Sequence, residues 1–242
     1  MNTRYTENLK RHIWRTIRKQ ELLSEGDRLM VALSGGKDSL VLLEAIADHS
    51  KRLPFKIDVL AVHVLIEEIG YQTDIEYLRT ICNNLKIPFM LVRPGFETNS
   101  SVEKSMCFIC SWHRRKVFFS INREQGYNKL AFGHHMDDAI ETLFMNMIYH
   151  GSMSSMPYKF DMFNGRLTVI RPMLEVTEEQ LELYALERNF KKEVKQCPFE
   201  NSKRKTLKHK IDLLSDNSNN ARKNIFRSME NIFTEYLPQR KE

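Results

Sequence analysis

The feature that most constrains the fold is a glycine turn, Ser34-Gly35-Gly36-Lys37-Asp38-Ser39, set between two apolar stretches. The run 28–33 before it predicts a buried strand, and the run 40–47 after it predicts a helix. Two glycines let the backbone bend tightly and approach a ligand with no Cβ in the way. The start of the helix supplies unpaired N–H groups that attract anions. The turn therefore predicts a phosphate-binding loop, although it lacks the Walker spacing GxxxxGK[ST].

The side chains of this turn suit a nucleotide phosphate. Ser34 and Ser39 offer hydroxyl donors, and Lys37 offers a cation. A bare phosphate would repel Asp38, so we expect its carboxylate to hold a Mg²⁺ ion that bridges to the phosphates. The alternative is an ordinary glycine turn between a strand and a helix, which the flanking apolar pattern makes less attractive.

Short apolar runs alternate with helical stretches along much of the chain, which predicts an α/β fold with a doubly wound, mostly parallel sheet. The five predicted strands are 28–33, 57–65, 88–92, 129–132 and 167–170. Predicted helices cover 40–47, 73–85, 117–123, 135–149, 177–189 (with Thr177 as N-cap) and 220–236. Ligands of such sheets bind at the carboxyl ends of the strands. We expect one domain over 28–190, with a basic helical segment at 1–27 and a basic extension at 191–242.

Composition excludes several classes of protein. Of 242 residues, 42% are hydrophobic and 28% are charged, which is typical of a packed globular chain and not of a disordered one. No apolar run approaches the ~18 residues of a membrane span. The first residues lack the apolar core and the small-residue cleavage site of a secretory signal peptide. We therefore expect a cytoplasmic protein with no membrane partner.

The net charge of +6 is concentrated in two segments. Residues 1–20 hold six Lys/Arg and one Glu, and residues 191–210 hold eight Lys/Arg and two Glu. Clustered cations favour a polyanionic partner such as RNA, although a solvated surface is the simpler alternative. In the first segment an apolar stripe at helical spacing would leave a basic face outward. The candidate RNA-binding residues are Lys10, Arg11, Arg15, Arg18, Lys203, Arg204 and Lys205.

Two segments resemble those of a known superfamily. The hexapeptide 34–39 resembles the PP-loop of the N-type ATP pyrophosphatases, and residues 133–142 resemble the GHxxDDxxET segment of their tRNA-modifying branch. The resemblance implies that ATP is split between its α- and β-phosphates. It also implies that Asp137 and Asp138 hold metal or act as a base; pairing with a helix dipole is the alternative. The implied ATP-binding residues are Ala32, Leu33, Ser34, Gly35, Gly36, Lys37, Asp38, Ser39, His63, Gly133 and His134.

The cysteines indicate which family of this superfamily the chain resembles. Cys107 and Cys110 form a CxxC pair, the spacing of a shared metal, whereas Cys82 lies in an apolar helix and is expected to pack. Together with the stretch 112–116 and the late Cys197, the pattern resembles the tRNA 2-thiocytidine synthetase family. That family implies a [4Fe–4S] cluster on Cys107, Cys110 and Cys197, whose fourth iron has no protein ligand. Structural zinc with His113 or His209 as fourth ligand is the alternative.

The family implies an ATP-dependent tRNA sulfurtransferase that adenylates C2 of an anticodon-loop cytidine and replaces the oxygen with sulfur. The implied partners are tRNA, a sulfur donor such as a cysteine desulfurase and a second copy of the chain. Segment 65–70 departs from the family because it lacks the usual polar loop. A lysidine synthetase, a 2-thiouridine synthetase and a non-catalytic ATP or redox sensor remain alternatives. The candidate catalytic residues are Lys37, Asp38, Arg114, Asp137 and Asp138.

Overall fold

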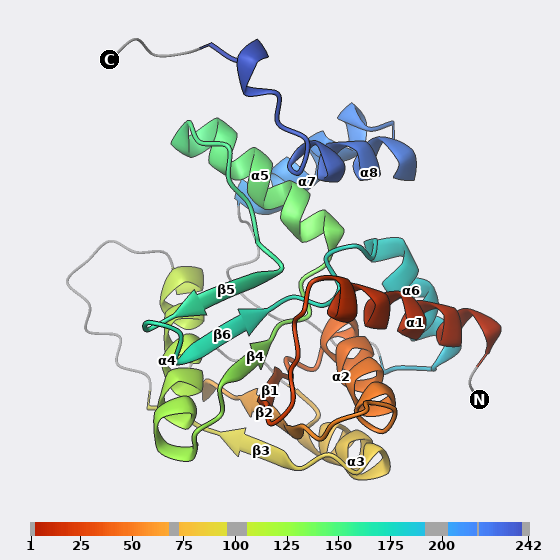
Figure 1. Cartoon of the computed structure of the whole chain (residues 1–242), viewed down its shortest axis with the longest axis vertical. Coiled ribbons are helices and arrows are strands. Elements are labelled where there is room, and N and C mark those ends of the chain that lie inside the picture. The colour runs from red at the N-terminus through yellow and green to blue at the C-terminus, as the bar shows by residue number, and fades with distance from the viewer. Residues whose placement is uncertain (1–2, 68–72, 96–105, 192–202, 217, 239–242) are drawn as a thin grey trace. The chain divides into compact units, whose positions relative to one another are not determined.

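The fold is built on a six-stranded sheet with the order β3-β2-β1-β4-β6-β5 (Figure 1). The computed structural model describes residues 3–67, 73–95, 106–191, 203–216 and 218–238. The strands are β1 (Arg28–Ala32), β2 (Asp58–Val64), β3 (Phe89–Val92), β4 (Lys129–Ala131), β5 (Lys159–Met162) and β6 (Leu167–Ile170). Strands β3, β2, β1, β4 and β6 pair in parallel with their neighbours, whereas the edge strand β5 pairs antiparallel with β6. The α/β prediction is confirmed, but the predicted count of five strands is wrong because β5 was missed.

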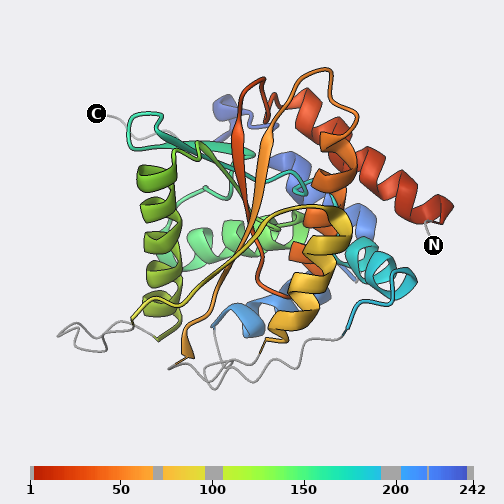
Figure 2. The ribbon, with the colours of Figure 1, turned by 90° about the horizontal axis from the view of Figure 1, so that it is seen from below.

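Helices cover both faces of this sheet, as the doubly wound prediction requires. α4 (Met106–Gln125) packs on one face through Val117, Phe118 and Ile121. The other face is covered by α2 (Lys37–Ser50) and α3 (Ile75–Leu85), with α1 (Arg4–Lys19) and α6 (Glu178–Glu187) in contact with α2. Figure 2 shows α4 on one side of the strands and α2 and α3 on the other.

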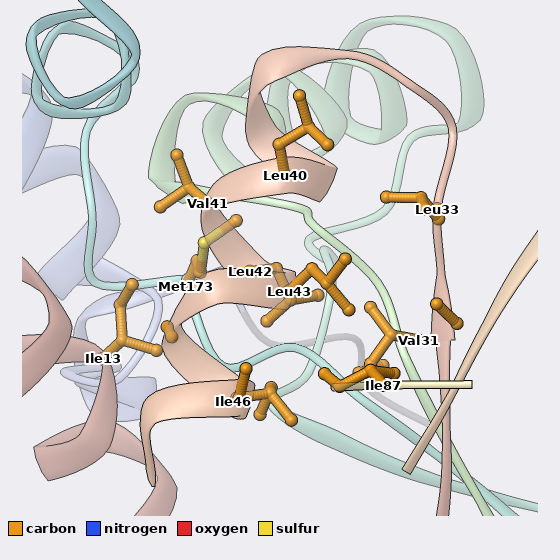
Figure 3. Close-up of a cluster of buried hydrophobic side chains, with 14 of the residues drawn as sticks. Ile13, Val31, Leu33, Leu40, Val41, Leu42, Leu43, Ile46, Ile87 and Met173 are labelled. Atoms are coloured by element: carbon orange, nitrogen blue, oxygen red, sulfur yellow. The ribbon is translucent and has the colours of Figure 1, made fainter. Parts of the chain in front are cut away.

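The helix that follows the glycine turn is buried almost all round, which explains its continuous apolar sequence. Leu40, Leu43 and Ile46 are less than 2% exposed, and the cluster around them joins α2 to the sheet, α1 and α6 (Figure 3). A fully buried helix loses its position only if many apolar contacts are broken at once. The packing therefore fixes the start of α2, where the glycine turn lies.

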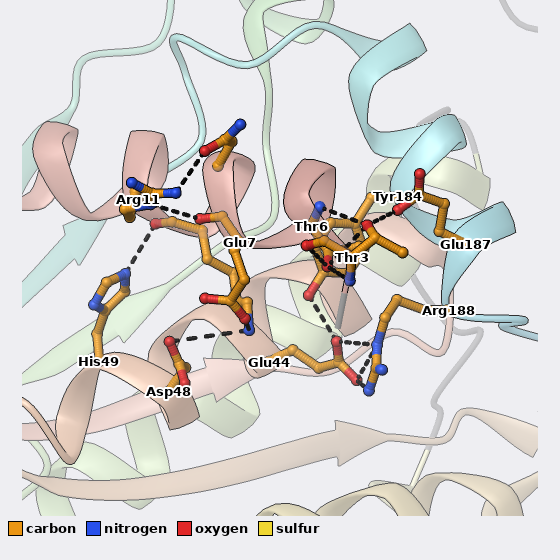
Figure 4. Close-up of polar contacts among 12 residues, drawn as sticks. Thr3, Thr6, Glu7, Arg11, Glu44, Asp48, His49, Tyr184, Glu187 and Arg188 are labelled. Atoms are coloured by element: carbon orange, nitrogen blue, oxygen red, sulfur yellow. Dashed lines mark hydrogen bonds and ion pairs between the residues drawn. The ribbon is translucent and has the colours of Figure 1, made fainter. Parts of the chain in front are cut away.

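The amino-terminal helix belongs to the same core. A capping box at Thr3 begins α1, and Leu9, Ile13 and Ile17 are buried as its stripe predicted. Lys10 differs from the prediction of an outward-facing cation, because its side chain is 5% exposed. Its ammonium lies 2.7 Å from Glu7 and 3.9 Å from Asp48. The backbone carbonyl of Lys10 also lies 2.9 Å from Nε2 of His49, as Figure 4 shows.

The chain divides into two compact units, 1–135 with 157–201 and 136–156 with 202–242. The second unit contains α5 (Met136–His150), α7 (Lys203–Leu214), α8 (Asn219–Ser228) and a 3₁₀ turn at Thr234–Tyr236. Met136 and Ile140 of α5 pack with Leu207 and Ile211 of α7 in a small core. α7 was not predicted. The predicted helix 220–236 ends early, because Ile232 and Phe233 are exposed and find no core to extend onto.

Within the described residues, no helix combines the length and the hydrophobicity that crossing a membrane would require.

Candidate nucleotide-binding site

The glycine turn lies at the carboxyl end of a central strand, where a doubly wound sheet binds ligands. Beyond β1 the backbone N–H of Leu33 still donates to the carbonyl of Val62, at 2.9 Å. Gly35 then takes a φ of +98°, which residues with a Cβ rarely adopt. Gly36 is the N-cap of α2, and the helix begins at Lys37. The first-turn N–H groups of a helix have no intrahelical acceptor, so this loop presents donors to an anion.

Two serines hold the loop in shape. The hydroxyl of Ser39 donates to the carbonyl of Gly36 at 2.8 Å and accepts from the N–H of Gly35 at 3.2 Å. The hydroxyl of Ser34 accepts from the N–H of Gly36 and donates to Ser39, both at 3.2 Å. Each hydroxyl proton is therefore used inside the loop. The serines order the backbone in this state, whereas the sequence analysis expected them to donate to phosphate.

The charged side chains of the loop neutralise one another. The Lys37 ammonium lies 3.3 Å from Oδ1 of Asp38 and 3.6 Å from Oε1 of Glu178 on α6. Oδ1 of Asp38 is buried and accepts no hydrogen bond from the described residues. In this state the Lys37 ammonium is the cation that such a buried carboxylate oxygen needs beside it. The donor set thus fits a Mg²⁺ ion at Asp38, with Lys37 released to bind phosphate.

Gly133 brings a second strand end against this loop. It follows β4, the neighbour of β1, and a Cβ at this position would lie 3.1 Å from the carbonyl carbon of Asp38. The same Cβ would lie 3.2 Å from the amide nitrogen of Ser39. The predicted ATP-binding residue Gly133 is therefore placed beside the phosphate loop, and the absence of a side chain permits the close approach. His134 follows, with its ring 5.4 Å from that of Phe132.

His63 stands near the end of the adjacent strand β2 and is 1% exposed. Its Nδ1 lies 2.7 Å from the carbonyl of Leu33, so Nδ1 carries the proton and Nε2 keeps a lone pair. Nε2 has no hydrogen-bond partner among the described residues. Burial, and secondarily the charge of Arg114 on α4, lowers the pKa of His63 and keeps the ring neutral. A neutral acceptor beside the loop fits an amino group of a nucleobase.

The structure describes only part of the site predicted for the [4Fe–4S] cluster. Cys110 lies on α4, half-buried against the core on that face of the sheet. The side chain of Cys107 and all of Cys197 lie outside the described residues, so the cluster ligands remain a prediction. Within the described part, no three potential metal ligands come together. Cys82 is fully buried, and burial raises the pKa of its thiol to about 11, as expected of a packing residue.

Asp137 and Asp138 lie in the first turn of α5, in the second unit. Asp137 is 4% exposed and accepts a hydrogen bond from Arg222 of α8, which also bonds Asp212 of α7. The Asp137 carboxylate is thus neutralised within its own unit by a contact that the sequence analysis missed. That both aspartates face the phosphate loop stays a prediction.

Three of the candidate RNA-binding residues on α1, Arg11, Arg15 and Arg18, are exposed as predicted. Arg11 and Arg15 line a hollow of about 300 Å³ between α1 and α6, together with His12 and Gln180, which the sequence analysis did not single out. Lys10 is buried and is removed from the set. Lys203, Arg204 and Lys205 lie in α7, but their side chains are outside the described part of the chain.

Comparison with known proteins adds independent evidence. Residues 5–196 match the PP-loop domain family. The chain is 33% identical to tRNA-cytidine(32) 2-sulfurtransferase of Bordetella avium, over 97% of this chain and 76% of that protein. It is 39% identical to the enzyme of the same name from Alkalilimnicola ehrlichii, over 70% of this chain and 54% of that protein. Among solved structures, the U34-tRNA thiolase NcsA of Methanococcus maripaludis, determined with its [4Fe–4S] cluster, shares the fold with a TM-score of 0.76 and 24% identity, covering 97% of this chain and 80% of that one.

Proposed function

The chain belongs to the PP-loop domain family and, within it, to the tRNA-cytidine(32) 2-sulfurtransferases, and on this premise we propose that it uses ATP to convert a cytidine of tRNA to 2-thiocytidine. One feature of the structure supports this proposal most directly. The glycine loop after β1 and Gly133 after β4 meet at the carboxyl edge of a doubly wound sheet, so closely that a Cβ at position 133 would stand 3.1 Å from the backbone of Asp38. That arrangement supports the binding of a nucleoside triphosphate at the carboxyl end of β1.

The first half of the reaction is adenylation. The C2 carbonyl oxygen of the cytidine attacks the α-phosphorus of ATP, an O–P bond forms, and pyrophosphate leaves with the bonding electrons. Lys37 and the N–H groups at the start of α2 stabilise the charge that develops on the phosphates. Asp38 would hold a Mg²⁺ ion, which would supply positive charge for the phosphates, and Nε2 of His63 accepts a hydrogen bond from the adenine amino group.

The second half is sulfur transfer. A sulfur nucleophile attacks C2, the C–O bond breaks, and AMP leaves with the oxygen. Cys107, Cys110 and Cys197 would hold a [4Fe–4S] cluster, which supplies an iron with an open position for the incoming sulfur. Arg114 lies one helical turn after Cys110 on α4 and is close enough to His63 for its charge to lower the pKa of that ring. We assign to Arg114 the stabilisation of negative charge during the transfer.

The proposal includes the partners of the reaction. The tRNA contacts the exposed arginines of α1, Arg11, Arg15 and Arg18, through its phosphates. A cysteine desulfurase or a comparable donor supplies the sulfur, and two copies of the chain form the working assembly. A cytoplasmic location brings the enzyme to its tRNA.

Nucleoside mass spectrometry tests the proposal. A strain that lacks the gene is complemented with the wild-type chain, with Lys37→Met or with Cys110→Ser, and its tRNA is digested to nucleosides. Only the wild type is expected to restore 2-thiocytidine. If the strain without the gene retains 2-thiocytidine, the proposal fails.

Two measurements on purified protein separate the alternatives. After anaerobic reconstitution, bound iron and sulfide support the cluster, whereas zinc without iron supports a structural site. Release of pyrophosphate from ATP in the presence of tRNA supports catalysis. Binding of ATP without pyrophosphate release under the same reconstituted conditions would identify a sensor instead.

A further inference from the structure

The α4 side of the sheet carries exposed aromatic rings and arginines. The group consists of Trp112 and Arg115 on α4, Phe160 and Phe163 on the β5–β6 hairpin, and Arg171 directly after β6; we call it the aromatic–arginine face. We propose that this face binds the unpaired bases and the phosphates of a single-stranded RNA loop. The inference rests on the proposed function, because it names how the tRNA substrate is held.

The three aromatic rings are exposed well beyond the needs of a core. Trp112 is 50% exposed, Phe160 is 52% exposed and Phe163 is 51% exposed. Large apolar rings lose free energy in water, so a group of them on one face indicates a partner. Aromatic rings beside cations are the usual platform for unstacked nucleobases, because every base offers a π-face to stack on.

The hairpin lies on the same side of the sheet as α4 and contacts it. Phe160 pairs in register with Val169, and cross-strand partners point to the same face of a sheet. Val169 packs with the α4 side of the core, so Phe160 lies on that side. At the hairpin turn, Phe163 meets Phe119 of α4 edge-on at 4.8 Å, and the amide of Asn122 on α4 donates to the carbonyl of Arg166 at 3.0 Å. Figures 1 and 2 show the turn of the hairpin beside α4.

The cations of this face are gathered without neutralising carboxylates. Arg171 follows β6 at the carboxyl edge of the sheet, and its Nη1 donates to the carbonyl of Pro157 at 2.8 Å. Its Nε is buried and has no hydrogen-bond partner in the described residues. Burial first, and then the charge of Arg115, lowers the pKa of Arg171. No ion pair joins either arginine to a carboxylate within the described ranges. Two neighbouring arginines with an unused buried donor fit a phosphate diester.

Single-stranded RNA fits these features better than a duplex does. In A-form RNA the bases are stacked within the helix, and their faces are closed to side chains. In an open loop the bases splay out and stack on aromatic rings, while arginines bind the phosphates. The face includes α4, the helix that carries Cys107 and Cys110, and Arg171 at the sheet edge where ATP is proposed to bind. A loop bound here would have its target base held close to the reaction.

The test measures binding of two RNA probes to the full chain. One probe is an anticodon stem–loop, and the other is the same RNA annealed to its full complement. Trp112→Ala and Phe160→Ala are each expected to weaken stem–loop binding about 5- to 100-fold, as loss of one base stack predicts, with little effect on the duplex. Trp112→Phe and Phe160→Tyr should restore most of the affinity. Leu186→Ala on α6, where the leucine is 63% exposed, is the matched control and should bind like the wild type.

A second readout separates phosphate contacts from stacking. Arg115→Ala is expected to reduce the slope of log affinity against log salt by about one, whereas Phe160→Ala leaves the slope unchanged. If both alanine variants of the aromatic residues bind the stem–loop as tightly as the wild type, this inference is overturned while the proposed function stands. If wild-type protein reconstituted with its cofactors binds neither RNA and forms no 2-thiocytidine, both fail together. If the variants instead lose binding of a protein partner and keep RNA affinity, the face is a protein-docking surface and the inference is likewise overturned.

Discussion

Gly133 lies against the backbone of Asp38 so closely that a Cβ at position 133 would stand 3.1 Å from the Asp38 carbonyl carbon. The two residues follow different strands, β4 and β1, which are neighbours in the sheet. Their contact joins the glycine loop to the segment that begins at Gly133, the two motifs that the sequence analysis linked to ATP. The link is between backbones, so it does not depend on side-chain rotamers.

Replacing Gly133 with alanine is therefore expected to disturb ATP binding. The neighbouring atoms belong to the backbone at the start of α2, which the surrounding core holds in place, so the extra methyl group must displace the loop by a few tenths of an ångström. We expect a loss of stability of about 1–2 kcal/mol and a KM for ATP raised about 10-fold or more. Gly95→Ala is the matched control, because nothing lies within 4 Å of its added Cβ. Equal ATP kinetics for the two variants would contradict the role of this contact.

Lys37→Met tests the cation of the loop. Methionine keeps the length and much of the packing of lysine but removes the charge that stabilises the leaving pyrophosphate. We expect pyrophosphate release to slow by about 100- to 1,000-fold in protein that is still folded, as a melting curve would verify. Lys51→Met, at the other end of the same helix, is the control and should retain wild-type turnover. A Lys37→Met enzyme with near-normal turnover would remove Lys37 from the mechanism.

His63 is expected to recognise the adenine amino group. The Nδ1 proton is used by the carbonyl of Leu33, so Nε2 is an acceptor and is suited to a donor on the base. The wild type should prefer ATP over purine riboside triphosphate, which lacks the 6-amino group, by about 10-fold in kcat/KM, as one hydrogen bond predicts. His63→Leu should lose this preference. An unchanged preference in the variant would show that the amino group is bound elsewhere.

Asp137 and Arg222 are expected to act first as a structural pair of the second unit. Arg222→Met removes the guanidinium that bonds a carboxylate only 4% exposed, which should cost about 3–5 kcal/mol in urea unfolding. The double variant Asp137→Asn, Arg222→Met should recover part of that loss, because the buried negative charge is then removed together with the guanidinium that bonded it. Asp138→Asn should keep stability and lower activity if Asp138 serves the reaction. Purely additive effects of the Asp137 and Arg222 changes would show that the pair does not couple.

The sequence predicted the parts of the fold that carry a local signal. The five parallel strands are apolar runs, and α2 is a continuous apolar stretch next to a glycine turn, so periodicity and turn chemistry were enough to find them. The N-cap at Thr177 was found for the same reason, because its signal lies within one turn of α6. The phosphate loop was predicted from its local sequence alone, a glycine turn between an apolar strand and an apolar helix.

The missed features depend on residues far away in the chain. β5 (Lys159–Met162) has exposed residues at an edge, and its pairing with β6 creates the strand. α7 is rich in lysine, and its apolar residues Leu207 and Ile211 gain a core from residues of α5 and α8. Lys10 was read as a surface cation, yet Asp48 and Glu7 bind its ammonium beside α2. The partners of these residues, and of Asp137, are set by tertiary packing that one sequence does not display.

Glu175 gives a prediction for acid stability. The His12 ring, whose Nε2 lies 3.6 Å from Oε2, acts with the Lys19 charge and the Tyr158 hydroxyl to lower the pKa of its carboxyl from 4.5 to about 2. A carboxyl whose pKa is depressed by folding stabilises the protein above its unfolded pKa. That contribution disappears as the pH falls from about 4.5 toward 2. Because Glu175 is 25% exposed, water screens these contacts, and we expect about 1–2 kcal/mol from it at neutral pH.

Glu175→Gln should therefore unfold more easily in urea at neutral pH, and its stability should fall less than that of the wild type on acidification over that range. Glu67→Gln is the control, because Glu67 forms an ion pair with Arg93 at 3.0 Å but is 67% exposed, where such pairs contribute little. Parallel acid profiles for wild type and Glu175→Gln would show that the contacts between α1 and the segment before α6 do not stabilise the fold through this carboxylate.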